Sequence, residues 1–257
     1  MFRLIFTTFF LFLFAYQSSA EKINLDEFTV NKYLKTKLSP GDWYLATKKR
    51  DSYYGLWFDA YTLAKIENEL VTELIFIGVA DVAGVYESVV NTAVQEIVFK
   101  NKYDGCYERP EYYLLEIYKR GNTVNCLRVG HADTNKELNF PDDPEVSNAQ
   151  FKKWLKYNKV KLPELMLWSK HLYFSRLSRG QMLEIEYSID PNLLNSPKIN
   201  FFTEERSEFH KNNIGNFPEH KKIMENWISI ASKRHKDFEQ NAKIRKHHAL
   251  DLKKYLN

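Results

Sequence analysis

The fold is decided by residues 165–189, which read LMLWSKHLYFSRLSRGQMLEIEYSI. Two runs of strand-forming residues, 165–177 and 182–189, flank a short polar turn at residues 178–180. In the second run apolar and polar side chains alternate, with Leu183, Ile185, Tyr187 and Ile189 on one face and Glu184, Glu186 and Ser188 on the other. This alternation predicts an antiparallel hairpin with one buried face and one face in water.

Two further hairpins are predicted upstream. Residues 56–63 and 70–79 are rich in strand formers, and residues 67–69 between them indicate a tight connection. Residues 112–119 and 123–129 flank Gly121-Asn122, where a leading glycine suits a type II′ turn because that position needs a positive φ. This turn places Cys126 opposite Ile117.

Helices are expected around these hairpins. Spacings of three and four favour a helix over residues 82–99. A capping box at residues 147–150 predicts the start of a central helix, and a long amphipathic helix begins near Pro218. Arg234 and Arg245 interrupt its apolar stripe, and its last turns, beyond about His247, are expected to fray. Residues 21–40 suggest a short helix or an ordered lead-in. The sequence therefore predicts one α+β domain over residues 21–257, an antiparallel sheet covered by the central and C-terminal helices.

Composition limits the class of protein. With 257 residues, 44% of them hydrophobic and 27% charged, the chain is that of a folded protein rather than a disordered one. A net charge of +4 does not indicate nucleic-acid binding. The sequence contains no internal repeat, which argues against a solenoid. The abundant Lys, Asn, Ile, Phe and Tyr have A/T-rich codons, which suggests an A/T-rich bacterial source.

The first twenty residues have the form of a secretory signal. Arg3 precedes an apolar run over residues 4–16, and small residues stand at Ser18 and Ala20. The run is shorter than the roughly 20 residues that span a bilayer, and no later run is apolar enough to do so. We expect cleavage after Ala20 and a mature protein in the periplasm or outside the cell.

Cys106 and Cys126 are the two cysteines. In an oxidising compartment two such residues are expected to form a disulfide, which would stabilise the fold by about 3 kcal/mol in the loop-entropy description. Neither cysteine lies in a C-x-x-C pair, which disfavours a redox or metal-binding role.

Motifs of catalysis are missing from the sequence. It has no G-x-S-x-G elbow, no glycine-rich phosphate loop and no H-E-x-x-H zinc motif. Residues 169–171, Ser-Lys-His, are predicted to alternate between the faces of a strand, which does not indicate a catalytic role. His131 and Asp133 follow a strand end and share a face, and with Glu108 they form a possible dispersed site.

Three weaker features carry functional alternatives. Glu184 and Glu186 share one strand face at a spacing compatible with a glycosidase pair, although a solvated sheet face also explains them. Aromatic rows on the hairpins could stack on sugar rings, although core packing explains them as well. The C-terminal helix is basic and could make a weak contact with an anionic surface.

These observations favour an exported, non-catalytic protein that binds a ligand or an envelope partner, with no metal or cofactor expected. The competing hypothesis is a secreted hydrolase with a dispersed active site around His131, Asp133 and Glu108. Absence of a local motif is weak evidence against the hydrolase, because catalytic groups can be brought together from distant parts of a chain.

Overall fold

The computed structural model describes residues 21–23, 26–31, 34–53, 56–81, 106, 113–120, 123–138, 147–175, 181–203, 205–243 and 248–251. The elements have the following bounds: β1 (Glu21–Ile23), β2 (Glu27–Asn31), β3 (Leu34–Lys37), β4 (Trp43–Tyr53), β5 (Leu56–Glu67), β6 (Leu70–Asp81), β7 (Leu114–Arg120), β8 (Thr123–Asp133), α2 (Thr134–Leu138), α3 (Ser147–Asn158), β9 (Leu165–Ser175), β10 (Gln181–Ile189), the 3-10 turns η1 (Pro191–Leu194) and η2 (Ile214–Asn216), α4 (Pro218–Lys243) and β11 (His248–Asp251).

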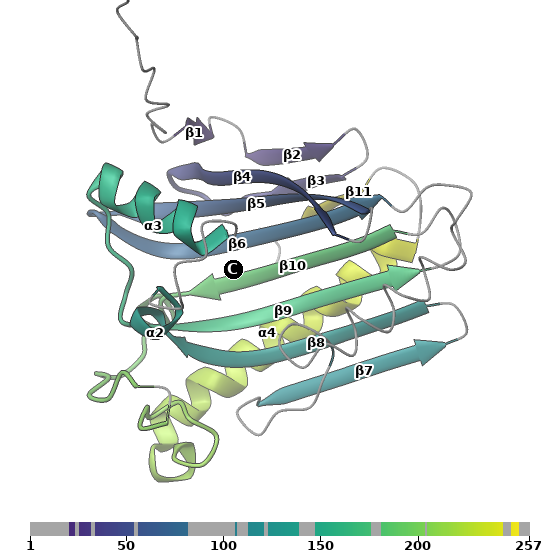
Figure 1. Ribbon diagram of the computed structural model, residues 1–257. Helices are drawn as coiled ribbons and strands as arrows, with labels where there is room; N and C mark the ends of the chain where they lie inside the picture. The colour runs from purple at the N-terminus through teal and green to yellow at the C-terminus, as the bar shows by residue number, and fades with distance from the viewer. Residues whose placement is uncertain are drawn as a thin grey trace, which may run out of the picture.

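An eight-stranded antiparallel sheet forms the centre of the molecule, with the strand order β1-β4-β5-β6-β10-β9-β8-β7 (Figure 1). The three predicted hairpins are the pairs β5–β6, β7–β8 and β9–β10. The β5–β6 hairpin joins the β9–β10 hairpin where β10 pairs with β6 along the full length of β10, from Gln181 opposite Asp81 to Ile189 opposite Glu73. The β7–β8 hairpin joins the sheet through the pairing of β8 with β9. The α+β class predicted from the sequence is confirmed.

The two faces of this sheet are covered by different helices (Figure 1). Trp227 and Phe238 of α4 belong to the same buried cluster as Ile77 and Ile185 of the sheet. On the opposite face, Trp154 of α3 packs in a smaller cluster over the β4–β6 end. The apolar face predicted for β10 is therefore the α4 side of the sheet.

Two expectations at the chain ends are wrong. Residues 21–40 contain β1, β2 and β3 rather than a helix. The long C-terminal helix ends at Lys243, and β11 follows it and pairs in parallel with β3 in a three-stranded sheet of order β11-β3-β2. β11 depends on a partner far away in the sequence, which local patterns do not reveal, whereas β2 and β3 are short strands that pair with each other. The helix predicted over residues 82–99 lies outside the described residues.

The predicted disulfide joins Cys106 to Cys126, with 5.9 Å between their Cα atoms, a separation normal for such a bridge. Cys126 lies in β8 opposite Ile117, as the hairpin register predicted. None of the helices in the described ranges has both the length and the apolar character needed to cross a bilayer.

Candidate functional site: two buried cations on one face of the sheet

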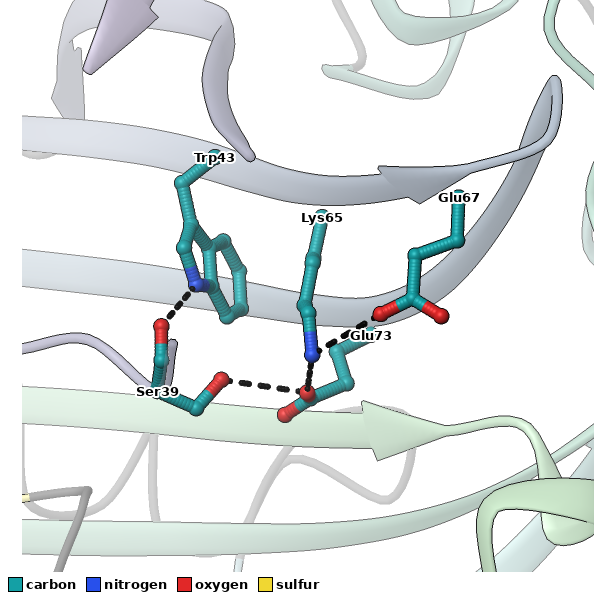
Figure 2. Close-up of polar contacts among 5 residues, drawn as sticks. All are labelled: Ser39, Trp43, Lys65, Glu67 and Glu73. Carbon is teal, nitrogen blue, oxygen red and sulfur yellow. Dashed lines mark hydrogen bonds and ion pairs between the residues drawn. The ribbon is translucent and has the colours of Figure 1, made fainter. Parts of the chain in front are cut away.

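The first buried cation on the α4 side of the sheet is Lys65, in a group that we call the Lys65 network: Ser39, Trp43, Lys65, Glu67 and Glu73 (Figure 2). Lys65 Nζ lies 2.9 Å from Glu73 Oε1 and 3.1 Å from Glu67 Oε1. Ser39 Oγ donates a second hydrogen bond to Glu73 Oε1 at 3.1 Å, and Trp43 Nε1 donates to the Ser39 carbonyl at 2.8 Å.

Local strand geometry builds this network. Trp43, Lys65 and Glu73 stand at paired positions across β4, β5 and β6, so their side chains share one face of the sheet. Burial alone would lower the pKa of Lys65, but its hydrogen bonds and charge contacts with Glu73 and Glu67 outweigh burial and raise that pKa. Lys65 is therefore charged and neutralised by carboxylates within hydrogen-bonding distance.

The second group, the Arg234 cluster, consists of Ser169, His171, Tyr187, Arg234 and His235. Ser169 and His171 are two residues apart on β9 and share the α4 side, where Ser169 stands opposite Tyr187 of β10. Arg234 and His235 come from α4, which crosses this part of the sheet. All five residues are buried, and Ser169 and His171 are 0% exposed.

A chain of hydrogen-bonding contacts runs through the cluster. Ser169 Oγ lies 3.3 Å from His171 Nε2, and His171 Nδ1 lies 3.3 Å from His235 Nδ1. The two imidazole rings stack with their centroids 5.4 Å apart. Burial lowers the pKa of His171 well below its usual range, with further lowering by His235 and Arg234, and burial lowers the pKa of His235 to about 4. Both rings are therefore neutral near pH 7.

The order Ser169, His171, His235 is that of a nucleophile, a base and an orienting group. The surroundings of these three side chains do not suit catalysis. Ser169 has no exposed surface, and β9 is paired on both sides at this position, with Val129 on β8 and Tyr187 on β10. These ladders use the neighbouring backbone N–H groups that an oxyanion would need. The arrangement serves as a buried polar contact between the sheet and α4.

Arg234 differs from Lys65 in its partners. Its guanidinium carbon lies 4.5 Å from the ring centroid of Tyr187 and 5.2 Å from that of Trp227, which are cation–π distances. Burial lowers the pKa of Arg234, while electrostatic interactions with Tyr187 and Glu73 oppose this. Among the described residues no carboxylate forms an ion pair with it, and its Nε has no hydrogen-bond acceptor.

The residues singled out in the sequence have other surroundings. His131 is buried on β8, with the rings of Tyr113 and His210 at centroid distances of 6.4 and 6.0 Å. Asp133 Oδ1 accepts hydrogen bonds from the backbone N–H groups of Asn135 and Lys136, so Asp133 caps α2. Glu108 lies outside the described residues. The proposed association of these three residues is therefore a prediction that stays open.

The Glu184/Glu186 pair and a further buried carboxylate, that of Glu208, have structural partners. Lys170 Nζ forms ion pairs with both Glu184 and Glu186, the latter at 3.7 Å, on the face of the sheet away from α4. Glu208 is buried and accepts hydrogen bonds from the backbone N–H and the side-chain amide of Asn200. In the part of the chain that the structure describes, no three His, Cys, Asp or Glu residues are grouped to hold a metal ion.

Two features of the sequence indicate the residues of the Arg234 cluster. Residues two apart on a strand share a face, so the alternation that separates Lys170 from Ser169 and His171 also brings the latter two together. The break in the apolar stripe of α4 at Arg234 was visible as well. The sequence does not show where α4 packs across β9, because local spacing carries no information about tertiary contacts.

Comparison with protein-family models, with curated proteins and with solved structures finds no match to this chain. The function must therefore be argued from its own residues.

Proposed function

We propose that this chain is an exported protein that folds in an oxidising compartment, periplasmic or extracellular, and acts there by binding rather than by catalysis. The observation that carries the export is the Cys106–Cys126 disulfide. Disulfides persist in the periplasm and outside the cell and are rare in the reducing cytosol. The signal-like residues 1–20 agree with this compartment.

Support for binding comes from the use that the fold makes of its acid–base groups. Asp133 caps a helix, Glu208 holds a loop, and Ser169 and His171 are sealed between the sheet and α4. A general base must come within hydrogen-bonding reach of the proton it abstracts, and these groups already contact protein atoms. The Arg234 cluster, in contrast, contains a cation without an anionic partner among the described residues, which is the type of group that a ligand can satisfy.

Export is tested by expressing the full chain in a bacterium and measuring the intact mass of the product in each cell fraction. We expect a periplasmic protein that begins at Glu21 and gains two hydrogens on reduction. The matched control is the double variant Cys106→Ser/Cys126→Ser, which should be processed at the same site but show no mass change on reduction. An unprocessed cytosolic product with two free thiols would contradict the proposal.

A hydrolase is the second candidate, because the order Ser169, His171, His235 is a recognised catalytic arrangement. The variant Ser169→Ala, with Ser188→Ala on the opposite face as its control, separates the two functions. If a hydrolytic activity is found and Ser169→Ala alone abolishes it, the binding proposal is wrong. We expect both variants to leave any measured activity equal to that of the native chain.

A further inference from the structure

Arg234 is held almost entirely out of water, with 4% of its surface exposed. It lies on α4 and faces Tyr187 of β10, with Trp227 two turns earlier on the same helix. Taking a guanidinium out of water is costly, and cation–π contacts return only part of that cost. Native proteins normally complete such a site with an anion.

The protein's own carboxylates do not complete it within the described residues. Glu73 is the acidic side chain whose charge reaches Arg234, but its Oε1 already accepts from Ser39 and pairs with Lys65. Arg234 Nε and Trp227 Nε1 are both buried N–H groups without an acceptor. The Trp227 ring lies 5.2 Å from the guanidinium carbon of Arg234, so two unsatisfied donors come from neighbouring side chains, which indicates that an acceptor belongs beside Arg234.

The surroundings restrict the charge of that acceptor. His171 and His235 are the nearest other basic groups of the cluster, and both are neutral near pH 7. Arg234 is therefore the one positive charge of the Arg234 cluster, which suits a monoanion rather than a doubly charged phosphate. Its neighbours Tyr187, Trp227, Ala231 and Phe238 belong to the apolar core, so the rest of the ligand should be apolar.

We propose that Arg234 anchors the carboxylate of an apolar monocarboxylate, whose hydrocarbon part lies between α4 and the sheet. This inference rests on the binding role proposed above and names the ligand class for it. A carboxylate fits the planar guanidinium through two parallel hydrogen bonds. Arg234 is on α4 and Tyr187 on β10, and α4 lies against this face of the sheet (Figure 1). The proposed ligand therefore requires the packing between α4 and the sheet to change when it binds.

The test uses the mature, oxidised protein and three probes: decanoate, decanol and acetate. Binding is measured by titration calorimetry, and exchange of the α4 amides by hydrogen–deuterium exchange. We expect decanoate to bind and to slow exchange in α4, with decanol and acetate each at least about tenfold weaker, the factor expected from one charge-assisted hydrogen bond.

Variants assign this binding to Arg234. Arg234→Met should remove decanoate binding, and Arg234→Lys should weaken it by about tenfold or more, because an ammonium does not provide the two-pronged contact. Lys233→Met, at the exposed neighbouring position, is the control and should bind decanoate as the native chain does. Unchanged decanoate binding by Arg234→Met, equal binding of decanol, or equal binding of acetate would each overturn the proposal.

Two further outcomes are decisive. Failure of Arg234→Met to fold would overturn the proposal, since it would show that the protein needs this charge for its structure. If the native chain is correctly processed and disulfide-bonded yet binds none of the probes, the Arg234 site is wrong while the proposed export is untouched.

Discussion

Lys65 and Arg234 are two buried cations on the same side of one sheet, and their partners differ. Lys65 has two carboxylates within 3.1 Å, one of which also accepts from Ser39. Arg234 has two aromatic rings and, among the described residues, no ion-paired carboxylate. Removing one member of a buried ion pair leaves the other charge uncompensated and is costly, whereas removing a buried charge that has no partner leaves no such charge behind. The comparison therefore separates a structural cation from one that the fold retains for another purpose.

The largest expected effect is at Lys65. Lys65→Met leaves Glu73 buried without its cation and should lower the free energy of unfolding by about 3–5 kcal/mol, the usual cost of breaking a buried pair. Urea unfolding at pH 7 measures it. The control is Lys22→Met, which removes the exposed ion pair with Asp42 at 2.8 Å and should cost less than about 1 kcal/mol. Equal losses for the two variants would mean that burial adds nothing at Lys65.

The second prediction is that acid lowers the free energy of unfolding through the histidines of the Arg234 cluster. The folded pKa values of His171 and His235 lie below the unfolded value, so the unfolded chain binds more protons as the pH falls below about 6.5. The stability from the neutral rings is present above that pH and is lost on approach to pH 4. Glu239 partly opposes this shift at His235, whereas Arg234 adds to it at His171. We expect a loss of about 2 kcal/mol for each of the two rings, and so about 4 kcal/mol in all, between pH 6.5 and pH 4.5.

Urea unfolding of His235→Phe across the same pH range checks this assignment. The variant keeps a ring against His171 but removes one titrating group, so its loss of stability should be smaller than that of the native chain. Lys65 does not contribute to this loss, because its raised pKa keeps it charged throughout acid and neutral pH. An identical pH profile for His235→Phe would contradict the assignment to the two histidines.

A smaller effect is expected at Ser169. Ser169→Ala removes one contact at 3.3 Å to a neutral imidazole and should lower the free energy of unfolding by about 1 kcal/mol. Ser169→Cys keeps a side chain of similar shape but replaces the hydroxyl by a weak hydrogen-bonding group, and tests whether packing explains the loss. A cost above about 3 kcal/mol for Ser169→Ala would show that the chain of contacts through His171 is stronger than its geometry indicates.

Strands and hairpins could be predicted because their signals are local. The alternation over residues 182–189 and the turn at Asn68 and Glu69, both with positive φ, are properties of consecutive residues. β11 could not be predicted, since it pairs with β3 across most of the chain. β2 and β3 pair with each other at short range, but strands of only five and four residues give a weak local signal. The same holds for the Arg234 cluster: β9 and β10 were foreseen, but the docking of α4 that brings Arg234 over Tyr187 depends on tertiary packing.

The most direct test of this account is the free energy of unfolding of Arg234→Met, measured by urea at pH 7 beside Lys65→Met and without any ligand. If Arg234 lacks an anionic partner, an apolar side chain of similar length should leave stability equal to the native value or raise it by about 1 kcal/mol. Lys65→Met should be strongly destabilised in the same experiment. A loss for Arg234→Met as large as that for Lys65→Met would contradict the account, because it would make Arg234 a structural cation as well.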